Sequence, residues 1–166
     1  MAEDFNKLRL TTRKMVKTPY KQGWQFRIEI EGEPIDFDIY VKEASHGPTE
    51  VNTEEDQYGG QTLTWPTGSA PVELALTLRD HEDERVAKWF DAWSAKVVFA
   101  DGTVGLPYGS DGYVKKVKRY SLVDDGRREE LRETWEMYPI KRGDVTESRE
   151  DAKHLEFTAV FRQFRS

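Results

Sequence analysis

The side chains best suited to chemistry are three histidines and two closely spaced aspartates. His46, His81 and His154 lie far apart, and none has a spacing typical of a metal site such as HExxH. Asp36 and Asp38 alternate along an expected strand and could form the carboxylate pair that glycosidases use for acid–base catalysis. Two acids on one exposed strand face are far more often solvated, so we favour that interpretation.

Other reactive sites have no counterpart in the sequence. The chain has no cysteine, which rules out disulfides and thiolate chemistry and suits a reducing cytosol. It also has no GxSxG motif, phosphate-binding loop or dinucleotide fingerprint. We therefore expect a protein that is not an enzyme, with no catalytic, cofactor-binding or metal-binding residues.

The charge is acidic overall and strongly segregated. The 25 basic and 31 acidic residues give a net charge of −6, which argues against a general nucleic-acid binder. Residues 1–21 are basic, whereas Lys42 is the one basic residue in the acidic range 29–56. Such segregation indicates a solvated face, or complementary surfaces in an oligomer. No apolar run approaches membrane-spanning length, so we expect no membrane partner.

A strand followed directly by a helix gives the clearest structural pattern. Four aliphatic residues alternate on one strand face: Val72, Leu74, Leu76 and Leu78. Four apolar residues then follow helical spacing: Val86, Trp89, Phe90 and Trp93. Asp80 marks the change and can accept hydrogen bonds from the first helical turn, where His81 is better explained by capping than by metal binding. The pattern predicts a helix at about 81–95 that covers a sheet.

Alternating apolar residues predict most of the remaining strands. Residues 24–30 and 35–41 both alternate, and the turn Glu31-Gly32-Glu33-Pro34 separates them, which predicts a hairpin with an acidic face. The polar residues 45–70 predict a long projecting hairpin, and 114–123, 130–138 and 155–161 predict further strands. We expect one domain, 1–166, with a mainly β body at 22–166: an antiparallel β-sandwich or barrel with one packed helix. Residues 1–21 form an N-terminal arm that either frays or docks on a neighbour.

The strand at 114–119 is basic and admits three interpretations. With Tyr113 and Tyr120 its lysines could form a nucleic-acid platform. It could instead be a solvated edge strand, whose lysines discourage unwanted pairing. The third interpretation is an oligomer interface, in which this strand or the basic arm meets the acidic stretch of the next subunit.

Taken in order, these features resemble the tail tube proteins of contractile-tailed bacteriophages. That group shares its fold with R-type pyocin tube proteins and the haemolysin-coregulated tube protein of type VI secretion. The resemblance covers residues 22–166 and rests on features in one order: the hairpin Trp24 to Val41, the run Lys42 to Pro48 before the projecting hairpin, the block Val72 to Trp93, Arg119-Tyr120, Tyr138-Pro139 and the aromatic strand Phe157 to Phe164.

The resemblance implies a structural subunit of the tail tube. Such proteins form stacked hexameric rings whose strands join into one inner β-barrel, a hollow conduit for DNA ejection. The implied partners are other copies of the chain, the tail sheath protein, the tape-measure protein and the baseplate hub, with DNA passing through without specific binding. The implied location is the virion, after assembly in the host cytoplasm.

The resemblance also suggests which residues make contacts. Charged residues in three segments are candidates for the subunit and ring interfaces: Arg9, Arg13, Lys14, Lys17, Glu54, Glu55, Asp56, Lys115, Lys116 and Lys118. Four acids are candidates for the lumen, where negative charge would repel phosphate: Glu29, Glu31, Asp36 and Asp38.

Several alternatives stay open. The basic arm and acidic segment 43–60 differ from the family pattern where ring contacts would lie, which allows a baseplate tube-initiator ring. A type VI secretion tube protein is a second alternative. A monomeric carbohydrate- or nucleic-acid-binding β-sandwich is the alternative from another class.

Overall fold

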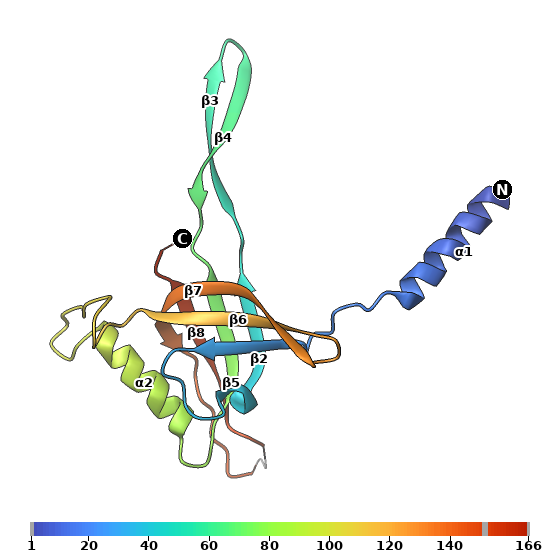
Figure 1. Cartoon of the computed structure of the whole chain (residues 1–166). Coiled ribbons are helices and arrows are strands. Elements are labelled where there is room, and N and C mark those ends of the chain that lie inside the picture. Colours follow the sequence, from blue (N-terminus) through green and yellow to red (C-terminus); the bar gives the residue numbers. More distant parts are fainter. Residues whose placement is uncertain (1, 151–152, 166) are drawn as a thin grey trace.

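The computed structural model describes residues 2–150 and 153–165, and its main feature is a six-stranded antiparallel sheet (Figure 1). The strand order is β1-β6-β7-β8-β5-β2, and the sheet curls into a half-barrel. Its strands are β1 (Phe26–Ile30), β2 (Val41–Gly47), β5 (Glu73–Arg79), β6 (Lys115–Val123), β7 (Arg128–Arg142) and β8 (Glu156–Gln163). The predicted mainly β, antiparallel fold with one packed helix is confirmed.

The core lies between one face of this sheet and helix α2 (Arg85–Val97). Strand β5 and helix α2 meet there, and each buries the residues that its period selects: Leu74, Leu76, Leu78, Val86, Phe90 and Trp93. The predicted strand-to-helix pattern is therefore confirmed, although α2 begins at Arg85 rather than near residue 81.

Asp80 holds the start of α2 from outside the helix. Its Oδ1 accepts a hydrogen bond from the Val86 N–H at 3.1 Å, and its Oδ2 accepts one from the Ala87 N–H at 3.4 Å. These are donors of the first turn that no helical carbonyl can reach. The capping role predicted for Asp80 is confirmed. Glu84 occupies the N-cap position in the left-handed conformation, at φ +56°, and makes no side-chain cap hydrogen bond.

Removing the Asp80 carboxylate should destabilise the domain through this helix start. We expect Asp80→Ala to lower the free energy of unfolding by about 1 kcal/mol, as measured by chemical denaturation. Asp80→Asn keeps one acceptor oxygen, so its free energy of unfolding should fall by less. Equal stability of Asp80→Ala and the parent protein would contradict the capping role.

The expected hairpin between residues 24–30 and 35–41 is wrong. Strand β1 pairs with β6, and residues 37–40 form a 3-10 helix, η1 (Phe37–Tyr40), preceded by Asp36 at φ +58°. The two aromatics buried there, Phe37 and Tyr40, are three residues apart, a spacing that suits a helical turn and not a strand. Phe37 packs against Trp89 with ring centroids 5.2 Å apart, and this contact holds the turn on the core.

The projecting hairpin at about 45–70 is confirmed. Strands β3 (Val51–Tyr58) and β4 (Gln61–Ser69) form a separate two-stranded sheet that leaves the half-barrel between β2 and β5 (Figure 1). At its base the Ala70 N–H donates to the Glu50 carbonyl at 2.9 Å. Every residue of both strands is exposed, so the hairpin adds nothing to the core.

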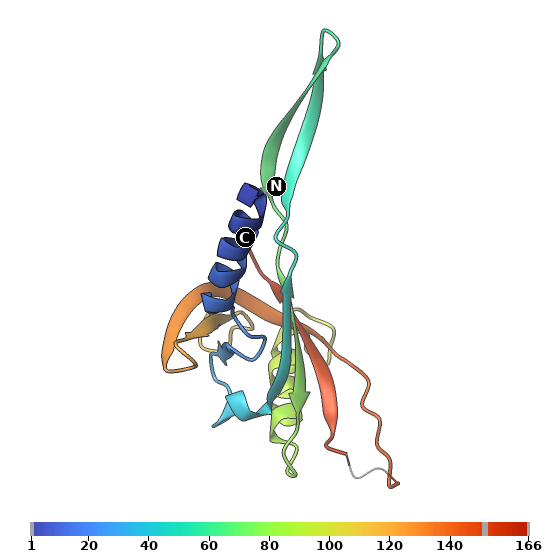
Figure 2. The same ribbon diagram turned by 90° about the vertical axis from the view of Figure 1, so that its right-hand side faces the viewer.

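The basic arm is helical, which the sequence pattern does not indicate. It forms helix α1 (Ala2–Lys17), which stands away from the half-barrel in Figure 1 and projects toward the viewer in Figure 2. Its apolar residues do not follow one clear helical stripe, which explains why periodicity did not reveal it. None of the described helices is both long enough and apolar enough to span a bilayer.

Candidate assembly interface

The half-barrel has two edge strands, β1 and β2, and they differ in how many of their outward backbone groups are already hydrogen-bonded. Strand β2 pairs only with β5 among the described strands, so its outer side is available for another strand. Edge strands with unpaired backbone groups invite pairing with another chain. The β2 edge also leads directly into the projecting hairpin.

The β1 edge is closed at both ends by local hydrogen bonds. Gln25 and Glu31 bond to β6, which directs the backbone groups of Phe26, Ile28 and Ile30 outward. The outward Phe26 N–H donates to the Trp24 carbonyl at 2.9 Å. At the other end, the Ile30 N–H donates to Glu33 Oε2 at 2.8 Å, and the Ile30 carbonyl accepts the Glu33 N–H at 3.1 Å. A short open stretch at Ile28 remains.

Removing the Glu33 carboxylate should lengthen this open edge. We expect Glu33→Ala to increase irregular association, seen as higher light scattering at equal protein concentration. Glu33→Gln is the matched control because its amide oxygen still accepts from Ile30. Burial raises the pKa of Glu33 above its ordinary value. The folded state of the parent therefore loses stability as the pH rises from the ordinary pKa to the raised one. Glu33→Gln does not ionise and avoids this loss. Identical scattering of Glu33→Ala and the parent would contradict the closure.

The face of the sheet opposite the core is covered by ion pairs of both signs. Arg27 contacts Glu129 at 2.9 Å and Glu29 at 3.3 Å, and Lys118 contacts Glu29 at 3.8 Å. Five further side chains form the pairs Lys42–Glu156 at 3.0 Å, Arg79–Glu156 at 3.1 Å and Arg162–Glu73. This surface is charge-balanced rather than acidic.

Two of the four lumen candidates lie on or beside this face. Glu29 projects from β1 among the cations, and the Glu31 carboxylate accepts the Lys116 N–H at 3.4 Å. Asp36 and Asp38 instead lie in the turn and 3-10 helix after β1, so the strand face expected for them does not exist. Burial raises the pKa of Asp38, partly offset by Arg27.

The basic strand divides its lysines between two faces because neighbouring residues of a strand alternate. Lys116 and Lys118 lie on the ion-paired face, whereas Lys115 points inward, with Nζ 4.9 Å from the centre of the Trp93 ring. Burial, with a contribution from Lys96, lowers the pKa of Lys115. Strand β6 lies between β1 and β7, so the edge-strand interpretation is wrong.

The projecting hairpin has two different faces. Register pairs Glu54 with Trp65, Asp56 with Leu63 and Tyr58 with Gln61, so one face carries a row of acids beside a row of apolar side chains. Glu55 faces the other way, opposite Thr64. The three acids predicted for an interface are therefore divided. Leu63 and Trp65 alternate in the sequence, which could have revealed this exposed apolar row.

Helix α1 presents a basic row. Arg9, Arg13 and Lys17 are four residues apart and lie along one side of the helix. Leu10 and Val16, each three residues from Arg13, flank this row and are exposed. Among the described residues, none of the ion pairs involves Arg9, Arg13, Lys14 or Lys17, and none involves Glu54, Glu55 or Asp56.

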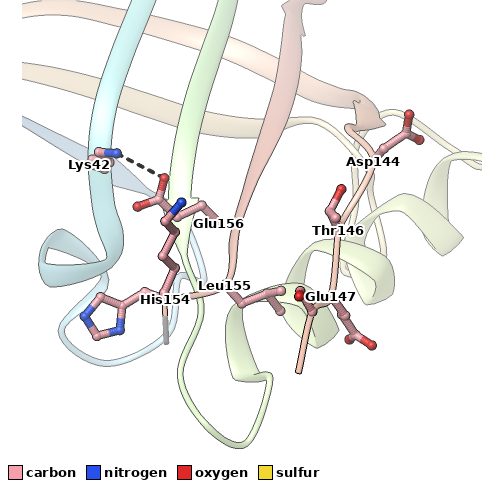
Figure 3. Close-up of a pocket in the computed structure, with 9 residues that line it drawn as sticks. Lys42, Asp144, Thr146, Glu147, His154, Leu155 and Glu156 are labelled. Atoms are coloured by element: carbon pink, nitrogen blue, oxygen red, sulfur yellow. Dashed lines mark hydrogen bonds and ion pairs between the residues drawn. The ribbon is translucent and has the colours of Figure 1, made fainter. Parts of the chain in front are cut away.

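An open pocket lies at the end of the sheet away from the hairpin and has a volume of about 770 Å³ (Figure 3). Its lining mixes both charges, and the Lys42–Glu156 pair lies on its wall. Hydrogen bonds from Lys42 and Arg79 lower the pKa of Glu156, which suits a fixed ion pair and not a general acid. Within residues 2–150 and 153–165, no three His, Asp or Glu side chains are arranged to hold a metal ion.

Neither protein-family models nor curated proteins show a match to this sequence. Solved structures do match. A chain of the PVC sheath–tube complex, from an extracellular contractile injection system, is 18% identical with a TM-score of 0.62, covering 93% of this chain and 94% of the other. A PVC sheath/tube terminator chain is 15% identical with a TM-score of 0.62, covering 90% and 96%.

A chain of the anti-feeding prophage tube-terminating cap is 12% identical with a TM-score of 0.63, and 89% of each chain is covered. At such identities the likeness concerns the fold, and it spans the half-barrel together with most of the rest of the chain. The fold implied by the resemblance is thereby confirmed. The chain has the fold of the tube and tube-terminating components of contractile injection systems.

Proposed function

We propose that this chain is a structural subunit of the tube of a contractile, phage-tail-like injection particle. The observation that carries the proposal is the projecting hairpin, an amphipathic two-stranded sheet with every residue exposed. An isolated two-stranded hairpin is at best marginally stable in water, so it needs a partner. A tube, in which each subunit meets copies of itself on several sides, supplies one.

The proposed assembly is a stack of hexameric rings. A chain of the anti-feeding prophage baseplate, a six-fold symmetrised structure, is 15% identical with a TM-score of 0.52, covering 89% of this chain and 93% of that one. The open β2 edge supports lateral joining of sheets into one barrel, because closure removes exposed edges. The arm and the Glu54–Trp65 face of the hairpin supply the proposed ring contacts: Arg9, Arg13, Lys14, Lys17, Glu54 and Asp56. Glu55 is not among them because it lies on the other face of the hairpin, and Lys116 and Lys118 are not because they lie on the ion-paired face of the sheet.

The partners proposed outside the ring are a sheath protein, a tape-measure protein and a baseplate hub, in a phage tail assembled in the host cytoplasm. DNA would pass through the lumen. We assign the ion-paired face, with Glu29 and Glu31, to the lumen. Arg27 and Lys118 on this face are already paired with Glu29, which supports passage of DNA without specific binding. Asp36 and Asp38 are not part of this face.

A ring that begins or ends the tube is the second candidate. The TM-scores of the terminator and cap chains, 0.62 and 0.63, are as high as the 0.62 of the sheath–tube chain. Helix α1 favours this candidate because its exposed basic row adds a contact surface that a ring at the end of the tube could use for a different partner. A ring of this kind would form hexamers that do not grow into long tubes.

Native mass spectrometry over a concentration series tests the proposal. Six-fold oligomers that appear as the concentration rises support a tube or end ring. A chain that remains monomeric at every concentration contradicts the proposal and favours a carbohydrate- or nucleic-acid-binding module.

A further inference from the structure

Two segments of this chain, α1 and the β3–β4 hairpin, lack support from the rest of the molecule. Helix α1 has 16 residues, and helices of this length are only marginally stable in water without a packed face. The hairpin is equally unsupported, because all the residues of its strands are exposed. Each segment therefore needs a surface that its own half-barrel does not provide.

The charges of the two segments are complementary. Residues 43–78 contain no lysine or arginine, and the acids of the hairpin have no ion-pair partner among the described residues. The basic row of α1 is likewise without such a partner. Opposite charges brought together at an interface set register and exclude wrong partners.

The spacing of the charges also matches. Arg13 and Lys17 are four helical residues apart, a rise of about 6 Å. Glu54 and Asp56 are two strand residues apart, a distance of about 7 Å. One helix laid along β3 can therefore place both cations against both acids.

Apolar residues lie where such a contact would continue. Trp65 and Leu63 stand directly across from Glu54 and Asp56, forming an apolar row beside the acidic row. On α1, Leu10 and Val16 flank the basic row and are 57% and 82% exposed. Contact would remove all four from water, the main favourable term in protein association.

We propose that α1 of one copy packs on the Glu54–Trp65 face of the hairpin of a second copy, an inference that rests on the proposed tube function. Figure 1 shows α1 to one side of the hairpin and apart from it. The hairpin that α1 covers therefore belongs to another copy, which the proposal places beside the first in the same ring.

Charge reversal tests the contact. We expect Arg13→Glu/Lys17→Glu and, separately, Glu54→Lys/Asp56→Lys to raise the concentration needed for ring formation at least tenfold, about the effect of a few reversed charge pairs. Glu55→Lys/Gln57→Lys, on the opposite face of the same strand, is the matched control and should assemble like the parent. Circular dichroism checks that each variant folds.

Mixing the two reversed variants shows whether the contact joins two copies. In an alternating ring, each reversed helix meets a reversed hairpin and each native helix a native hairpin, so an equal mixture should assemble where neither variant does alone. Failure of the mixture, with recovery when all four changes are on one chain, would overturn the contact between copies. Parent-like assembly of both variants would also overturn it, while leaving the tube function intact; a parent protein that never assembles would overturn both.

Discussion

A chain in which Val51–Ser69 is replaced by the turn Asn-Gly should fold normally and fail to assemble. The Ala70 N–H already donates to the Glu50 carbonyl at 2.9 Å, so a two-residue turn can close the shortened hairpin there. All the residues removed are exposed, and therefore no buried apolar surface is lost. Sedimentation velocity should show monomers at concentrations at which the parent forms rings.

The free energy of unfolding separates loss of assembly from loss of folding. In the monomer it should change by less than about 1 kcal/mol, the range typical of surface changes. A control chain with Glu55→Ala and Gln57→Ala alters the polar face of the hairpin and should still assemble. Rings or tubes formed by the shortened chain would show that the hairpin has no part in assembly.

Trp93→Ala should have the largest effect on stability of any single change. Trp93 is 1% exposed, stacks on Phe161 with ring centroids 5.1 Å apart, and donates its indole N–H to the Tyr113 carbonyl at 2.6 Å. We expect the free energy of unfolding to fall by about 3–5 kcal/mol, from a large cavity together with an unpaired carbonyl. Urea denaturation monitored by circular dichroism measures this free energy.

A second tryptophan provides the matched control. Trp24 is 57% exposed, so Trp24→Ala should change stability by less than about 1 kcal/mol. Trp93→Phe keeps most of the stacking but loses the N–H, and should fall between the two. If Trp93→Ala cost no more than Trp24→Ala, α2 would not be the element that covers the sheet.

The elements that the sequence predicts well are those decided by local patterns. Leu74, Leu76 and Leu78 alternate because β5 has one buried face, and the same sequence pattern then changes to helical spacing at Asp80. The projecting hairpin was predictable from its turn residues. In these segments, periodicity and capping chemistry agree with the tertiary structure.

Residues 35–41 show where such patterns fail. They alternate like a strand, yet Ile35 and Ile39 are 81% and 70% exposed, while Phe37 is buried on Trp89. Strand β6 pairs with β1 instead, although it is some ninety residues further along the chain. Alternation shows which residues of a segment share a face, but it does not show which strand the segment pairs with. Pairing depends on contacts between residues far apart in the sequence.

The candidate interface was only partly predictable, for the same reason. Composition identified the charged segments, but the register of β3 with β4 decides that Glu54 and Asp56 share a face with Trp65 and that Glu55 does not. The closing of the β1 edge by Glu33 depends on how the chain turns after Ile30. Neither feature follows from residue types alone.

Negative-stain electron microscopy of the purified chain over a range of concentrations distinguishes a tube subunit from a monomeric module. We expect six-fold rings with a central hole, stacked into hollow tubes if the chain is the main subunit and left as single rings if it begins or ends the tube. Uniform monomers at the highest concentration, in a sample shown to be folded, would contradict it.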